Sequence, residues 1–87
     1  MTELRLRDEG VAWKEVDGEI VALDEQAAVY LAANPAGALL WRTLAGGSTR
    51  EALVAELMRA YEIDRDTASA DTDAFLRDLR ERGLLDG

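Results

Sequence analysis

The sequence contains no cysteine and no histidine, and Lys14 is its only lysine. Without cysteine there is no disulfide and no thiolate chemistry. Without histidine, Ser48 and Ser69 have no imidazole that would activate them as nucleophiles. No glycine-rich loop has phosphate-binding spacing, and the pair Asp64-x-Asp66 lacks the later ligands of a calcium loop. We therefore predict a protein that is not an enzyme, with no catalytic residue, no metal site and no cofactor.

Long apolar runs are also missing, and the N-terminus has no apolar segment typical of a signal peptide. We therefore predict a cytoplasmic protein without a membrane span. Its 87 residues predict one domain, 1–87, with a thin core. The net charge of −8, from 18 acidic against 10 basic residues, argues against nucleic acid or an anionic membrane as partner.

Hydrophobic and turn patterns predict three strands in the first part of the chain. The first covers Val11–Val16, and Asp17-Gly18 joins it to a second over residues 19–23 as a hairpin. The third covers residues 28–32. Leucine and arginine alternate at residues 4–7, a pattern compatible with a further short strand.

Three helices are predicted to follow, over residues 35–45, 49–61 and 65–82. Asn34 and Asp64 are expected to cap the first and third, and Ser48 with Glu51 reads as a capping box for the second. The predicted buried face of the second helix ends at Tyr61. The fold class is therefore α+β, a three-stranded antiparallel sheet followed by three helices, in a winged helix-turn-helix-like order.

Residues 26–41 carry no charge, although 32% of the chain is charged. The third predicted strand lies in this window. Exposed edge strands usually carry Lys, Pro or a bulge that prevents pairing with other chains, and Val29, Tyr30 and Leu31 supply none of these. One interpretation places the strand in mid-sheet, with these residues as core. The other, which we prefer, is an edge that an extended peptide covers.

The third predicted helix offers a surface that could face this strand. Asp71 lies beside the apolar face and has no basic residue four positions later, whereas Asp73 with Arg77 and Asp78 with Arg82 have the spacing of surface ion pairs. Trp13 and Trp41 are interpreted as packing residues. The predicted peptide-binding residues are Ala28, Val29, Tyr30, Leu31, Ala32, Asp71, Ala74, Phe75 and Asp78.

An ordered set of residues resembles the PqqD-like family, the recognition elements of ribosomal peptide natural-product biosynthesis. The resemblance covers about residues 11–86. It rests on Tyr30, Asn34, Gly37, Trp41, Leu44, Gly47, Thr49, Leu57, Tyr61, Asp71, Phe75, Leu76, Leu79, Gly83, Leu84 and Leu85. It implies a non-catalytic domain that binds the leader segment of a precursor peptide. The leader would add as an antiparallel strand beside residues 28–32, against the third helix.

The stretch from Tyr30 to Gly37 is most similar to the stand-alone leader-binding subunits of lasso-peptide pathways. This resemblance implies a second partner, a leader-cleaving cysteine protease. Three alternatives stay open. One is a PqqD-type peptide chaperone in pyrroloquinoline quinone synthesis or another modified-peptide pathway. The others are an acidic winged-helix regulator and a module that self-associates through its third strand.

Overall fold

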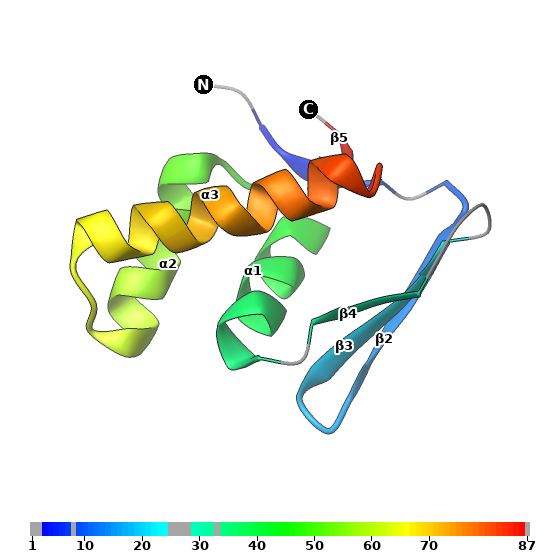
Figure 1. Ribbon diagram of the computed structural model, residues 1–87, viewed down its shortest axis with the longest axis horizontal. Coiled ribbons are helices and arrows are strands. Elements are labelled where there is room, and N and C mark those ends of the chain that lie inside the picture. The colour runs from blue at the N-terminus through cyan, green and yellow to red at the C-terminus, as the bar shows by residue number, and fades with distance from the viewer. Residues whose placement is uncertain (1–2, 8, 25–28, 33, 87) are drawn as a thin grey trace.

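The computed structural model describes residues 3–7, 9–24, 29–32 and 34–86. Over these residues the chain forms an α+β arrangement of three helices and two small antiparallel sheets (Figure 1). The elements are β1 (Arg5–Leu6), β2 (Val11–Val16), β3 (Glu19–Asp24), β4 (Val29–Ala32), α1 (Pro35–Ala45), α2 (Arg50–Tyr61), α3 (Arg65–Glu81) and β5 (Leu85–Asp86).

The larger sheet has the order β2-β3-β4, and a hairpin starts it. Asp17 and Gly18 have φ angles of 53° and 80°, and a two-residue turn of this kind matches the twist of its flanking strands. The turn fixes the register, so that Val16 lies opposite Glu19. β4 then pairs antiparallel with the other side of β3.

The prediction of a single sheet was wrong, because β1 and β5 form a second one. Leu6 lies opposite Leu85, so the first and last strands of the chain are neighbours (Figure 1). Buried Leu84 precedes this strand, and an ion pair of 2.7 Å between Arg7 and Asp24 links the chain beside β1 to the end of β3. The C-terminal residues Leu84 and Leu85 therefore pack back against the start of the chain, and Leu85 does so as part of a paired strand.

Side chains cap all three helices, although one cap differs from the prediction. Asn34 accepts from the Gly37 amide at 2.6 Å, and Asp64 caps α3 in the same way. The second helix begins one residue later than predicted, with Thr49 as its cap. The reason is that the amide and carbonyl of Ser48 both bond to Leu4, which holds Ser48 in extended backbone.

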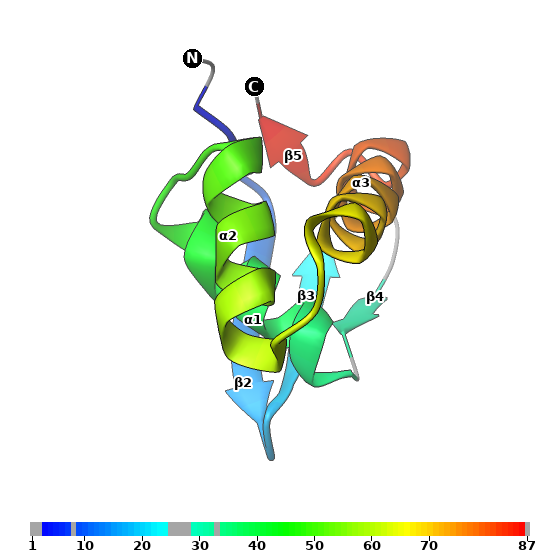
Figure 2. The same cartoon turned by 90° about the vertical axis from the view of Figure 1, so that its left-hand side faces the viewer.

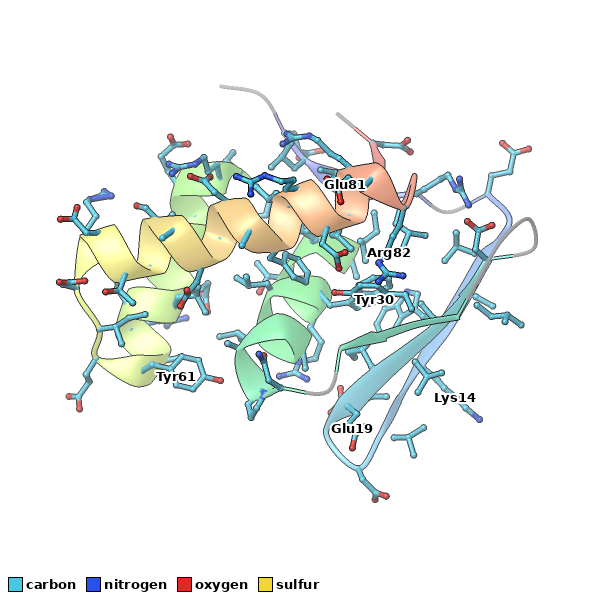
Figure 3. The ribbon with its side chains drawn as sticks, viewed as in Figure 1. Lys14, Glu19, Tyr30, Tyr61, Glu81 and Arg82 are labelled. Carbon is cyan, nitrogen blue, oxygen red and sulfur yellow. The ribbon has the colours of Figure 1, made fainter. Side chains whose placement is uncertain are left out.

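The core lies between the helices and the inner face of the larger sheet. Trp41, Leu44, Leu53 and Leu79 are completely buried, and α3 contributes the predicted apolar face. Tyr61 does not join them and is 42% exposed. It is the last residue of α2 and points away from α3 (Figure 3), where it lines a surface pocket together with residues of the hairpin turn.

An ion pair between helices also replaces a predicted one within a helix. Asp73 bonds to Arg50 at 2.7 and 2.9 Å, and not to Arg77. Arg50 starts α2, which packs along α3. Its guanidinium therefore donates two parallel hydrogen bonds to the Asp73 carboxylate. Such a bidentate pair is stronger and more specific in geometry than a single hydrogen bond.

Candidate functional site

The strand β4 lies at an edge of its sheet. Its residues pair with β3, from Leu23 opposite Val29 to Ile20 opposite Ala32. Within the described residues no strand pairs with the other side of β4. The interpretation that this strand lies in mid-sheet is therefore wrong for the described part of the chain, and its outer backbone groups are available for pairing.

The opposite edge of the sheet is β2, and its sequence protects it. Lys14 and Glu15 lie in the middle of this six-residue strand, and charges of this kind disfavour pairing with another strand. Figure 3 shows Lys14 pointing away from the helices. By contrast, β4 carries neither charge nor proline and lies on the side of the sheet nearest α3 (Figure 2). The uncharged edge is thus the one beside a helix.

The helix α3 runs in the direction opposite to β4. At one end, the Arg82 guanidinium lies 5.1 Å from the ring centre of Tyr30, early in β4. At the other end, Asp71 and Ala74 share a pocket with Asn34, which follows β4. We call the space between the outer edge of β4 and α3 the β4–α3 groove.

A pocket of about 360 Å³ occupies one end of this groove. Its apolar wall comes from α1, α2 and α3, including buried Leu40, Leu57 and Phe75. Asp71 and Asp78 add carboxylates, and Ala74 is a small exposed residue between them. The complete lining is Asn34, Ala36, Gly37, Leu40, Leu57, Asp71, Ala74, Phe75 and Asp78. We call this the α1–α3 pocket; it suits an apolar side chain with polar neighbours.

The other end of the groove is built around Tyr30. Its ring is stacked on Trp41 with centroids 5.2 Å apart and planes 17° from parallel, and Trp13 meets Trp41 edge to face at 5.9 Å. Arg82 covers Tyr30, while its Nε–H donates to Oδ1 of Asp78 at 3.0 Å. Figure 3 shows Tyr30 and Arg82 side by side between α3 and β4. We call Trp13, Trp41, Tyr30 and Arg82 the aromatic stack; its members come from the sheet, from α1 and from the C-terminal end of α3.

The surroundings of Tyr30 change its acidity. Burial raises the pKa of the phenol above its usual 10.0, and the negative charge of Asp78 raises this pKa further, whereas Arg82 lowers it. The folded state therefore holds the phenolic proton more tightly than the unfolded chain does. This contribution to stability is complete below pH 10 and is lost as the pH rises through the higher folded pKa.

We accordingly expect the free energy of unfolding to fall above pH 10, and to fall less in Tyr30→Phe. The measurement is urea unfolding at a series of alkaline pH values, with phenolate absorbance followed in parallel. Tyr61→Phe is the control, because Tyr61 lies outside the stack and is 42% exposed. An identical pH dependence in Tyr30→Phe and the unchanged protein would contradict the assignment.

The structure brings four of the predicted binding residues, Asp71, Ala74, Phe75 and Asp78, into one pocket. Tyr30 lies at the other end of the groove with 7% of its surface exposed, so most of its ring is packed rather than free. Val29, Leu31 and Ala32 contribute their backbones to β4, and Ala28 lies outside the described residues. Asp78 lines the pocket and also forms the ion pair with Arg82 that its spacing predicts.

Sequence reasoning missed the contact of Arg82 with Tyr30 and the part that α1 and α2 play in the pocket. A signal for Arg82 was present, since Asp71, Phe75, Asp78 and Arg82 follow the spacing of a single helix face. Leu40 and Leu57 gave no such signal, because their pattern is that of any core leucine. Over the described residues, no group of three acidic, His or Cys side chains is placed to hold a metal ion. No helix found there is long and apolar enough to cross a membrane.

Fold and groove together define a class of protein, a small α+β domain with an open strand edge beside a helix. The family model described as "Coenzyme PQQ synthesis protein D (PqqD)" matches residues 19–85, and the chain belongs to this family. The predicted family resemblance is thereby confirmed. A search of curated proteins gave no match.

Two solved structures match over nearly the whole chain. "TbiB1 in Complex with the TbiA(beta) Leader Peptide" has a TM-score of 0.85 and 28% identity, and the match covers 95% of both chains. "Lasso peptide synthetase B1 complexed with the leader peptide" has a TM-score of 0.83 and 26% identity, over 99% of this chain and 100% of that chain. Both of these similar proteins are therefore described in complex with a leader peptide.

Proposed function

We propose that this protein binds the leader segment of a ribosomally made precursor peptide, of the lasso class, and performs no catalysis itself. The observation that carries the proposal is the uncharged outer edge of β4, with which no described strand pairs, beside the α1–α3 pocket. The two similar structures described as complexes with leader peptides support the same ligand class.

The leader would extend the larger sheet as a fourth, antiparallel strand. Alternate residues of β4 would exchange backbone hydrogen bonds with it, which gives affinity independent of leader sequence. Leader side chains on the side of α3 would enter the α1–α3 pocket and supply the sequence preference. Because one added strand buries little surface, a few such anchors would carry most of the affinity.

We assign the interface to the nine residues predicted from the sequence, with Ala28 to Ala32 as the pairing strand and Asp71, Ala74, Phe75 and Asp78 as the facing helix. In this function the protein presents the bound leader to a separate cysteine protease that removes it. Adding this protein to the protease is expected to accelerate leader cleavage. A leader that is cleaved equally fast without it would count against this step.

A peptide chaperone in coenzyme PQQ synthesis is the second candidate, and the description of the matching family supports it. The two candidates share the groove and differ in the leader that is bound. We propose a winged helix-turn-helix-like order of elements without DNA binding. The reason is that α3 carries five acidic residues, Asp66, Asp71, Asp73, Asp78 and Glu81. An acidic helix repels the DNA backbone.

Fluorescence anisotropy with a labelled leader peptide of a lasso precursor tests the function. N-methylation of the leader at alternate positions removes the N–H groups that would pair with β4, and we expect at least about a tenfold loss of affinity. The matched control is N-methylation at the intervening positions, which face away. Equal losses at both sets would argue against strand addition. A dimer that persists at saturating leader would indicate that β4 serves self-association.

A further inference from the structure

The β4–α3 groove carries opposite charges at its two ends. Asp71 lines the α1–α3 pocket, is exposed, and forms no ion pair with any described residue. Arg82 lies over Tyr30 at the other end, and its side chain is 45% exposed. Only its Nε–H bonds to Asp78, so its terminal amino groups have no hydrogen-bond partner among the residues that the structure describes.

A peptide strand in this groove has a defined direction. Because β4 and α3 run in opposite directions, a peptide antiparallel to β4 runs parallel to α3. Its N-terminal part then lies beside Asp71 and its C-terminal part beside Arg82. The charges at the two ends therefore meet different halves of the peptide.

The spacing of the two charges sets a spacing in the peptide. Asp71 lies on α3, and Arg82, the C-cap residue of this helix, follows eleven positions later with helical backbone angles, which is about 16 Å along a helix. A strand covers this distance in about five residues. Side chains of a strand alternate between its two faces, so two that both point towards α3 are separated by an even number. The compatible separations are four and six residues.

We propose that the groove selects its peptide by charge order, an inference that rests on the proposed leader binding. A basic residue towards the N-terminus pairs with Asp71. An acidic residue four or six positions later pairs with the free amino groups of Arg82. Apolar residues between them fill the pocket. The preferred ligand is thus an extended peptide with a basic, then apolar, then acidic pattern, and the reversed order places like charges together at both ends.

The test is selection from a display library of random twelve-residue peptides on the full-length protein. Peptides that also bind an Ala74→Trp variant are discarded, because Trp at this position fills the α1–α3 pocket. Enrichment of Lys or Arg four or six residues before Asp or Glu is the expected result. A labelled synthetic peptide of the enriched consensus then serves as the probe for variants.

Asp71→Asn is expected to lower the affinity for the consensus peptide about three- to fivefold, and Arg82→Gln is expected to lower it by a similar factor. Glu81→Gln and Arg80→Gln are the matched controls, since these exposed residues of α3 do not line the pocket, and we expect changes below about twofold. Asp71→Lys should lower the affinity for the consensus peptide further. Changing the basic residue of the peptide to Glu should restore its affinity for this variant.

The outcomes separate this inference from the function on which it rests. Peptides that depend on the pocket but lack a charge order, or that show the reverse order, overturn the inference and leave peptide binding intact. A selection that yields no pocket-dependent peptide contradicts both. Failure of the Asp71→Lys rescue overturns the pairing at that end of the groove even where a charge order is found.

Discussion

Ala74→Trp is expected to reduce leader affinity at least about thirtyfold, which is the loss typical of removing a principal anchor of an interface. Ala74 is exposed and lines the α1–α3 pocket together with Asp71 and Phe75. An indole at this position fills the space that the leader side chain would occupy. Since Ala74 is not part of the buried core, the folded domain does not have to rearrange.

Stability and binding must be measured together for this variant. Trp is a weaker helix former than Ala by about 0.5 kcal/mol, and Ala55→Trp on α2 is the control for this cost. Ala55 is also exposed and helical, and it does not line the pocket. We expect both variants to lose about the same small amount in urea unfolding, and only Ala74→Trp to lose binding. Unchanged leader affinity in Ala74→Trp would show that the pocket is not an anchor site.

Local signals were sufficient to predict most of the elements. Asn34 and Pro35 mark the start of α1, and Asp17-Gly18 forms the hairpin turn that its sequence indicates. The β1–β5 sheet was not predictable in this way. It consists of two short strands from the two ends of the chain. The alternation at residues 4–7 was compatible with a strand, but so short a segment does not indicate which other segment pairs with it. Ser48 shows the same limit, because its pairing with Leu4 decides where α2 begins.

The candidate site also has features that the sequence predicted and features that it did not. The absence of charge along β4 was visible in the sequence because edge protection is a property of single residues. The pocket was only half visible, since α3 shows its own face but not the leucines that α1 and α2 bring to it. Arg50 pairing with Asp73, and Arg82 covering Tyr30, depend on how α3 is oriented. Orientation follows from packing of the whole core, which no local pattern records.

Tyr30→Ala is expected to lower the free energy of unfolding by about 3 kcal/mol, as for other large aromatic residues truncated in a core. Tyr30 is 7% exposed, and its ring is stacked on Trp41 and lies beneath the Arg82 guanidinium. Such a loss is large for a domain of 87 residues, whose total stability is on the order of 4 to 13 kcal/mol.

Tyr30→Phe keeps the ring and its stacking, so its stability should stay within about 1 kcal/mol of the original. Urea unfolding followed by tryptophan fluorescence measures both variants, because Trp41 lies directly against the altered ring and Trp13 against Trp41. If Tyr30 served only as a contact for the peptide, its removal would weaken binding without lowering stability, and that result would contradict the stack. The packed ring instead gives β4 a fixed position on the core, and a fixed edge loses less conformational entropy when a peptide strand pairs with it.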